Sequence, residues 1–240
     1  MDYNDFYQDE RRREQGQLTE SLPSYTAKTF LWMFLGLLTT FGVAVGGYVS
    51  GIIIYAFLSI PAFHMIILVA ELAVVLVLSA RIHKLSVPMA TVLFFAYAAL
   101  TGVVFSTLFW IFDLSSLVLV FAVTALYFGA LSLFGYFTKT DLTRLRPILM
   151  GGLIFLVLFG LLSLFLPSFS GLERLYCLAG IAIFLGLTAY DTQRIRDYYF
   201  AYAHDGQMAQ KASIFSALQL YLDFINLFLY LLRFMGKGKR

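Results

Sequence analysis

Long runs of apolar residues, separated by short polar stretches, follow a polar beginning of 27 residues. A helix needs about 20 apolar residues to cross the roughly 30 Å hydrocarbon core of a bilayer. Seven runs are long enough, at residues 29–50, 61–80, 89–112, 116–137, 148–166, 175–195 and 217–235. They are too long and too uninterrupted for barrel strands, which alternate over segments of about ten residues. The pattern therefore predicts an all-α integral membrane protein, a bundle of seven transmembrane helices.

Composition and loop lengths support one membrane domain. Hydrophobic residues make up 60% of the chain and charged residues only 13%, against about 25% charged in soluble proteins. The longest internal polar stretch, 196–211, is too short to separate domains and contains Asp205-Gly206 as a plausible turn. We therefore expect a polar cytoplasmic tail at 1–27 and a transmembrane domain at 28–240.

The distribution of Lys and Arg predicts the orientation. Twelve of the 17 basic residues lie in the N-terminal tail and in alternate loops, whereas the other loops hold only Arg174. By the positive-inside rule, the N-terminus is cytoplasmic. The four basic residues after residue 232 break this order if the seventh segment crosses. A re-entrant segment would avoid the conflict, but we favour crossing because the segment is long enough to span.

Asp223 lies in the middle of the last apolar run, where a carboxylate costs about 2.5 to 3.5 kcal/mol on insertion scales. Helical spacing places Gln219, Asn226 and Tyr230 on the same face, with Ser216 one turn earlier. This polar stripe suits a water-lined path. A buried hydrogen-bond network with neighbouring helices is the alternative reading.

Asp191 lies near the cytoplasmic end of the sixth segment and could pair with Arg194 three residues later. Because the sixth and seventh segments are consecutive, they are expected to be neighbours. If the seventh enters near Ala217, Asp223 lies roughly 9 Å along it, and the carboxyl groups of Asp191 and Asp223 can meet. Two carboxylates in contact cannot easily both ionise in a low dielectric, so the pair is expected to share a proton and to respond to pH. Their oxygens also suit transient Ca²⁺ binding.

Glu71 is a third acid, near the middle of the second segment, and an acid at that depth needs an interior role. Enzyme chemistry is not indicated. The chain has no HExxH, no GxSxG, no P-loop and no zinc-like cluster of His or Cys. Intramembrane aspartyl proteases combine Tyr-Asp with Gly-x-Gly-Asp, and only Tyr190-Asp191 is present. Nucleic-acid binding is unsupported because topology accounts for the basic residues, and no cofactor is expected.

Three motifs resemble one known family. Tyr-Leu-Asp-Phe-Ile-Asn at 221–226, Leu-Leu-Arg-Phe at 231–234 and Ala-Tyr-Asp-Thr-Gln-Arg-Ile at 189–195 closely resemble the Bax inhibitor family, also called the transmembrane Bax inhibitor motif family. The resemblance covers nearly all of the chain after the tail, including Glu-Leu-Ala-Val-Val from Glu71 and Ser-Ala-Arg ending at Arg81. It implies a seven-helix bundle with the last helix central and a pH-sensitive Ca²⁺ leak.

The resemblance also implies roles for particular residues. Asp191 and Asp223 match the family's di-aspartyl pH sensor on the cytoplasmic side, and Arg81 is the candidate for an arginine that latches to it. We therefore expect a pH-gated, calcium-permeable leak channel in a bacterial cytoplasmic (inner) membrane, with Glu71, Gln219, Asn226 and Tyr230 as pore-lining candidates. Two alternatives remain open. One is a regulator that binds a membrane partner, such as a membrane-bound protease, through residues 2–20. The other is a proton-coupled cation exchanger.

Overall fold

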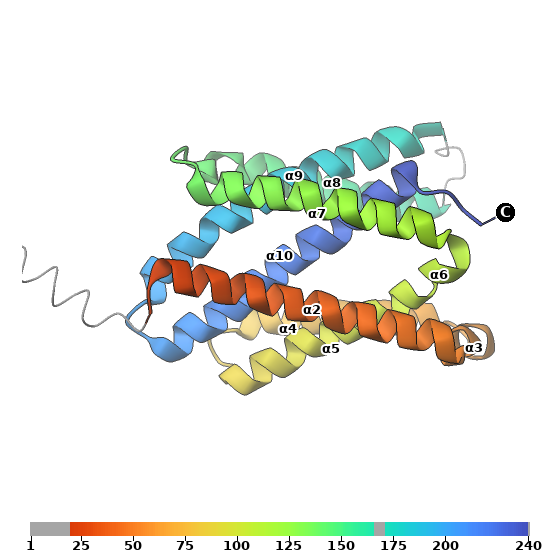
Figure 1. Ribbon diagram of the computed structural model, residues 1–240, viewed down its shortest axis with the longest axis horizontal. Coiled ribbons are helices and arrows are strands. Elements are labelled where there is room, and N and C mark those ends of the chain that lie inside the picture. The colour runs from red at the N-terminus through yellow and green to blue at the C-terminus, as the bar shows by residue number, and fades with distance from the viewer. Residues whose placement is uncertain (1–19, 166–170, 240) are drawn as a thin grey trace, which may run out of the picture.

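The computed structural model describes residues 20–165 and 171–239, and these residues form a helical bundle (Figure 1). Seven of its helical segments are long and apolar enough to cross a membrane. The prediction of an all-α bundle of seven transmembrane helices is therefore confirmed. The helices are α2 (Leu22–Ser50), α3 (Ile52–Ser59), α4 (Phe63–Arg81), α5 (Val87–Ser106), α6 (Leu108–Ile111), α7 (Leu114–Phe137), a short 3-10 helix (Leu142–Leu145), α8 (Arg146–Phe165), α9 (Glu173–Tyr202) and α10 (Gly206–Met235).

Local sequence signals set several of the helix ends. Ser21 and Ser86 cap the starts of α2 and α5, and each is followed by a proline in the first helical turn, where the missing N–H costs nothing. Gly51 ends α2 with a left-handed backbone (φ 67°), a conformation that glycine adopts without strain. The carboxylate of Asp205 accepts hydrogen bonds from the backbone N–H groups of Gln207 and Met208 and so starts α10.

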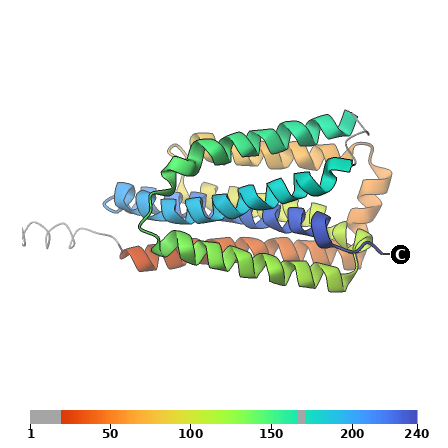
Figure 2. The same ribbon diagram turned by 90° about the horizontal axis from the view of Figure 1, so that it is seen from above.

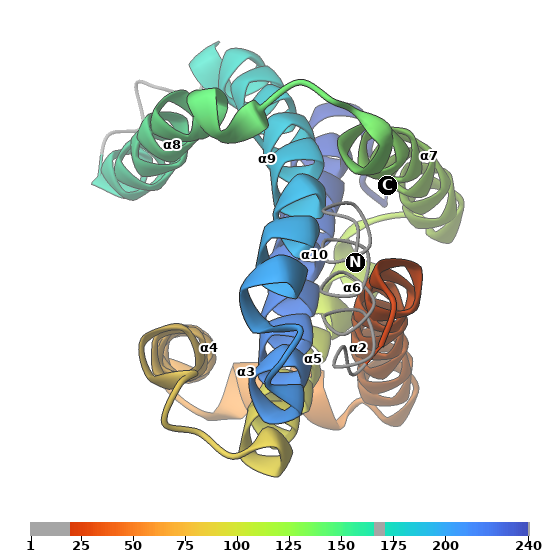
Figure 3. The ribbon, with the colours of Figure 1, turned by 90° about the vertical axis from the view of Figure 1, so that its left-hand side faces the viewer.

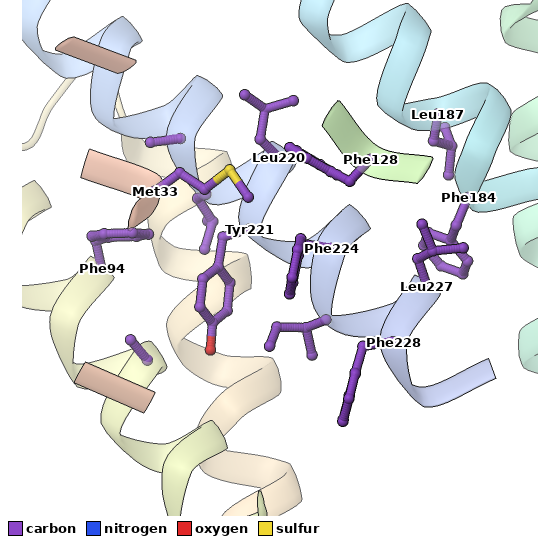
Figure 4. Close-up of a cluster of buried hydrophobic side chains, with 14 of the residues drawn as sticks. Met33, Phe94, Phe128, Phe184, Leu187, Leu220, Tyr221, Phe224, Leu227 and Phe228 are labelled. Carbon is purple, nitrogen blue, oxygen red and sulfur yellow. The ribbon is translucent and has the colours of Figure 1, made fainter. Parts of the chain in front are cut away.

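The last helix, α10, lies at the centre of the bundle, as predicted (Figure 3). It packs against α9, α2, α7 and α5, while α4 and α8 lie at the periphery against α5 and α9. Side chains from most of its length are buried, and Figure 4 shows Tyr221, Phe224 and Phe228 of α10 among aromatic and aliphatic neighbours. In a bilayer, polar and ionisable residues of a helix face the interior of the bundle, and the buried Lys211, Ser216 and Asp223 of α10 fit that central position.

Two predicted boundaries are wrong. The polar stretch 196–211 is not a loop, because α9 continues to Tyr202 and α10 begins at Gly206 rather than near residue 217. Helix α2 likewise begins at Leu22, so residues 22–28 extend it rather than the tail. The reason is that hydropathy detects only the part of a helix in hydrocarbon, whereas backbone hydrogen bonding continues through polar residues. Residues 1–19 lie outside the described residues, so the predicted tail remains a prediction there.

The described chain begins at one end of the bundle and finishes at the other (Figure 1). Because α10 runs the full length of the bundle, this arrangement agrees with a seventh segment that crosses. Beyond α10, the backbone of Lys237–Lys239 pairs with that of Ile111–Asp113, through Asp113 N to Lys237 O (3.2 Å) and Lys239 N to Ile111 O (2.9 Å). The C-terminal segment is thereby tied to the link between α6 and α7 (Figure 2).

The contact between α7 and α9 depends on Gly135. A Cβ at this position would overlap the backbone carbonyl of Ala189, two residues before Asp191. Backbone cannot move aside as a flexible side chain can, so the absence of a side chain allows the two helices to approach. Gly129, on the same helix, has no atom within 4 Å of an added Cβ.

We expect Gly135→Ala to lower the thermal stability of the detergent-solubilised protein, because α7 must shift away from α9. The expected loss is about 1–3 kcal/mol, the usual cost of overpacking. Gly129→Ala is the matched control and should be neutral or slightly stabilising, since alanine is the better helix former. Equal melting temperatures for the two variants would contradict a tight contact at Gly135.

Candidate functional site: a buried aspartate pair

The carboxyl groups of Asp191 on α9 and Asp223 on α10 meet inside the bundle. A side-chain hydrogen bond joins them, and their side chains are only 8% and 3% exposed. The pairing follows from the antiparallel arrangement of the two helices, in which Tyr198 packs near Phe215 on one side of the pair and Phe184 stacks on Tyr230 on the other. A hydrogen bond between two carboxyl groups requires that one of them carries a proton. The two acids therefore form a site that can hold one shared proton.

The two acids have different surroundings. Arg194 interacts electrostatically with Asp191, but its guanidinium lies 4.8 Å from the centre of the Tyr198 ring and 5.7 Å from that of Tyr190, and it donates a hydrogen bond to the Tyr198 hydroxyl. Arg194 and Asp191 form no ion pair, so the predicted alternative of a direct Asp191–Arg194 pair is not observed. Asp223 Oδ2 is buried without a hydrogen-bond partner among the described residues.

The other members of the predicted polar stripe on α10 are packed rather than open to water. The Tyr230 hydroxyl donates to that of Tyr176 on α9 (3.0 Å), which donates to the carbonyl of Leu156 on α8 (2.9 Å). The Asn226 amide donates to the carbonyl of Leu222 in its own helix (2.8 Å). Gln219 is half-buried, and Ser216 is 1% exposed with an unpaired hydroxyl. In this structure the stripe is therefore a contact surface with α9.

Glu71 lies in a second polar cluster, on the other side of α10. Its Oε1 accepts a hydrogen bond from Thr101 Oγ1 (2.9 Å), and Thr101 in turn interacts with the side chains of Tyr97 and Tyr221. The Tyr221 hydroxyl is 2.6 Å from Thr40 Oγ1. These five residues, the Glu71 cluster, connect α4, α5, α10 and α2. Tyr221 and Asp223 are two residues apart and so project from opposite faces of α10, which places the central helix between two acidic sites.

The sequence reasoning found Glu71 but missed its four partners. Threonine and tyrosine are common in membrane helices, and no spacing along the chain links residues from four different helices. Helical periodicity describes one helix at a time, so only the packing of α2, α4, α5 and α10 brings the cluster together.

Arg81, the latch candidate, is not brought to the aspartate pair. It is the last residue of α4, it is exposed, and it makes no ion pair with any described residue. A basic residue that the sequence reasoning assigned to a loop is instead buried in α10. Lys211 is 7% exposed, and its ammonium donates to the backbone carbonyl of His83 in the link after α4 (3.2 Å). The latch role of Arg81 remains a prediction.

A small cavity lies at the end of the bundle where the described chain begins. It has a volume of about 180 Å³ and is lined by residues of α2, α7 and α9: Leu22, Thr26, Gly135, Tyr136, Thr192, Gln193 and Arg196. Gln193 also anchors the link between α7 and α8, since its side chain accepts from Leu142 N (2.9 Å) and donates to Thr140 O (2.8 Å). Thr192 follows Asp191 directly along α9, and the cavity lies at the end of the bundle that the charge pattern places in the cytoplasm.

The bundle and its buried acids define the class of protein, a helical integral membrane protein with ionisable groups inside. The family model described as "Inhibitor of apoptosis-promoting Bax1" matches residues 22–240. The chain belongs to this Bax inhibitor family, and the predicted resemblance is confirmed at that level.

Bacterial relatives match along nearly the whole chain. "Inner membrane protein YbhL" of Escherichia coli (strain K12) is 42% identical over 219 residues, covering 91% of this chain and 93% of the relative. An uncharacterised protein of Rickettsia prowazekii is 41% identical over 220 residues, covering 92% of each chain. One from Borreliella burgdorferi is 38% identical over 215 residues, covering 90% and 92%. The seven candidate spans and the printed name of the Escherichia coli relative support the predicted location in a bacterial inner membrane.

Proposed function

We propose that the protein is a pH-sensitive, calcium-permeable leak channel in which Asp191 and Asp223 sense protons and gate the path. The observation that carries the proposal is the buried contact between these two carboxyl groups, on the two helices at the centre of the bundle. Acids inside a membrane bundle mark ion and proton pathways more often than they serve packing alone. Membership of the Bax inhibitor family is the second support, because the leak activity is an expectation from the family resemblance.

The proton acts by holding α9 and α10 together. With one shared proton, the hydrogen bond between the carboxyl groups closes the contact. When that proton leaves, two negative charges face each other where water is scarce, and their repulsion favours separation of the helices. The shared proton belongs on Asp223, because Asp191 has Arg194 nearby whereas ionised Asp223 has no donor for its buried Oδ2. Loss of the proton at higher pH therefore opens the gate.

Few other charged groups interact with the two aspartates. Arg194 and Asp223 are the charged groups that interact with Asp191, and Tyr198 is a titratable neighbour. Asp191 is the charged group that interacts with Asp223. Among the described residues, α2, α5 and α7 contribute no charge to the pair. In this proposal, protons would reach Asp191 from the cytoplasmic end of the bundle, where the cavity beside Thr192 lies.

Calcium is a passing ion in this proposal, not a resident cofactor. Ca²⁺ takes six to eight oxygen ligands, and two carboxylates supply too few without water. Within the described residues, no group of three or more His, Cys, Asp or Glu side chains could hold a metal. Once separated, the two carboxylates would bind Ca²⁺ transiently through their oxygens. Glu71 would attract cations along the other side of α10. Gln219, Asn226 and Tyr230 would line the path only after α9 and α10 move apart.

The test is calcium entry into liposomes that contain the purified protein and an internal calcium indicator. We expect passive flux that rises as the pH is raised on the side of the pair. If calcium flux instead requires an imposed proton gradient, and stops when an ionophore removes that gradient, the protein is an exchanger and not a channel. If the protein is shown to be folded in the liposomes and no calcium flux occurs at any pH, both the channel and the exchanger are contradicted. The remaining alternative is then a regulator of a membrane partner.

A further inference from the structure

An apolar groove lies between α2 and α7, with α10 as its floor. It has a volume of about 430 Å³ and lies toward the end of the bundle where α2 finishes and α7 begins. Its walls include Phe41, Ala44, Leu117 and Phe121, and its floor includes Phe224 and Phe228 of α10 (Figure 4). We call it the α2–α7 groove. It is separate from the aspartate pair, because α10 turns Asp223 toward α9 and not toward α2.

Hydrocarbon suits this groove better than water. Among its lining residues, Thr40 alone has a polar side chain, and its hydroxyl is already bonded to Tyr221 and to the carbonyls of Ala98 and Gly36. The rims are open to the surroundings, since Phe41 is 62% and Val118 61% exposed. Water in such a site would find no polar partners. A groove that opens sideways within the membrane meets lipid chains instead.

The length of the groove matches the depth of one leaflet. Along α2 the lining runs from Phe34 to Ala44, or about 15 Å at 1.5 Å per residue. This is half of the roughly 30 Å hydrocarbon thickness, the depth of one leaflet. An acyl chain of a phospholipid extends through one leaflet, so the length of the groove suits one extended acyl chain.

Positive charge lies at the outer end of the groove. The Lys239 ammonium donates to the backbone carbonyl of Phe109, a lining residue (2.7 Å), and lies 5.8 Å from the centre of the Tyr48 ring. Lys237 is exposed beside the start of α7, where its backbone N–H donates to Ser116. Asp113 is the acid of this rim. Trp110, which packs on Tyr48, is 48% exposed. Aromatic residues of this kind mark the headgroup level.

We propose that the α2–α7 groove binds one acyl chain of an anionic phospholipid, with the phosphate held near Lys237 and Lys239. The apolar groove, its single-leaflet length and the cationic rim all favour this occupant. The lipid would seal the gap between α2 and α7 over Phe224 and Phe228, on the central helix itself.

The first test uses the unmodified protein in nanodiscs that contain phosphatidylglycerol with a photoactivatable diazirine in its acyl chain. After irradiation, we expect lipid adducts on the groove-lining parts of α2, α7 and α10, and fewer when excess unlabelled phosphatidylglycerol competes. Adducts spread evenly over lipid-facing helices, including α4 and α8, would overturn the proposal. So would cross-linked dimers without lipid adducts, because a helix of a second copy would then fill the groove.

The second test uses matched variants and native mass spectrometry with phosphatidylglycerol and phosphatidylcholine as probes. Leu38 lines the groove and is 48% exposed, whereas Leu31 lies seven residues earlier on α2 and is 55% exposed outside it. Leu38→Trp should lose bound lipid while Leu31→Trp keeps it. Lys237→Gln should reduce the preference for phosphatidylglycerol about fivefold, and Lys139→Gln, at the opposite end, should not. Equal lipid retention by the two tryptophan variants, or an unchanged preference in Lys237→Gln, would overturn the proposal.

Discussion

Replacing Asp223 with asparagine is expected to remove the pH dependence of calcium flux through liposomes that contain the protein. An asparagine amide can donate to Asp191 at every pH, so the contact between α9 and α10 no longer requires a proton. As an order of magnitude for two ionised carboxylates in contact, like unit charges about 4 Å apart repel by about 4 kcal/mol at an effective dielectric constant of about 20. That exceeds the 1.4 kcal/mol needed for a tenfold change. Flux should therefore vary by more than about tenfold with pH in the unmodified protein and by less than about twofold in Asp223→Asn.

Asp191→Asn should behave in the same way, because either substitution leaves one ionisable carboxyl group. Asp197→Asn is the matched control, since Asp197 lies on the same helix but is exposed, and it should keep the pH profile of the unmodified protein. Folding is checked by size-exclusion chromatography in detergent and by helical circular dichroism. If both Asp191→Asn and Asp223→Asn keep the original profile, the aspartate pair is not the sensor.

A direct structural measurement accompanies the flux assay. Leu178 on α9 and Phe234 on α10 are 47% and 42% exposed, so cysteines there can carry spin labels once the native Cys177 is replaced by serine. The distance between the labels should lengthen as the pH rises, and it should stay constant when Asp223→Asn is added. A distance that does not change with pH in the unmodified pair would contradict gating by separation of α9 and α10.

Glu71→Gln is expected to lower calcium flux about tenfold, equivalent to about 1.4 kcal/mol, while the shape of the pH profile is retained. Glutamine keeps the size of the side chain and its carbonyl oxygen still accepts from Thr101, but the negative charge that attracts cations is lost. The pH profile should persist because the Glu71 cluster and the aspartate pair lie on opposite faces of α10. The assay is the same liposome flux measurement, normalised to the amount of reconstituted protein.

Two further variants separate charge from packing at Glu71. Thr101→Val removes the hydrogen bond to Glu71 but keeps its charge, so its flux should fall less than that of Glu71→Gln. Glu173→Gln removes an exposed acid at the start of α9 and should be neutral. Unchanged flux in Glu71→Gln would exclude Glu71 from the ion path and leave the Glu71 cluster as a packing element.

Only part of the site was accessible to sequence reasoning. The contact of Asp191 with Asp223 could be anticipated because consecutive antiparallel helices are neighbours and both acids were expected near the same, cytoplasmic, end of their segments. Its depth was misjudged, since the predicted start of the last helix near residue 217 differs from the observed start at Gly206. The pair lies near the middle of two 30-residue helices, about 16 Å along α9 and about 25 Å along α10 from the turn that joins them.

By itself, the sequence determined the class of the protein, the seven spans and the acids that must be accounted for, and it predicted the direction of the spans. These properties follow from the length of apolar runs and from where charges fall along the chain, so one helix at a time suffices to read them. Only the tertiary structure decided which polar groups meet: Glu71 with Thr101, Lys211 with the His83 carbonyl, and Tyr230 with Tyr176. It also decided that α2 and α7 leave an apolar groove over α10. The physical reason is that in lipid every helix is apolar on most of its surface, so hydrophobicity does not select neighbours. Close packing at residues such as Gly135, and a few buried hydrogen bonds, make that selection.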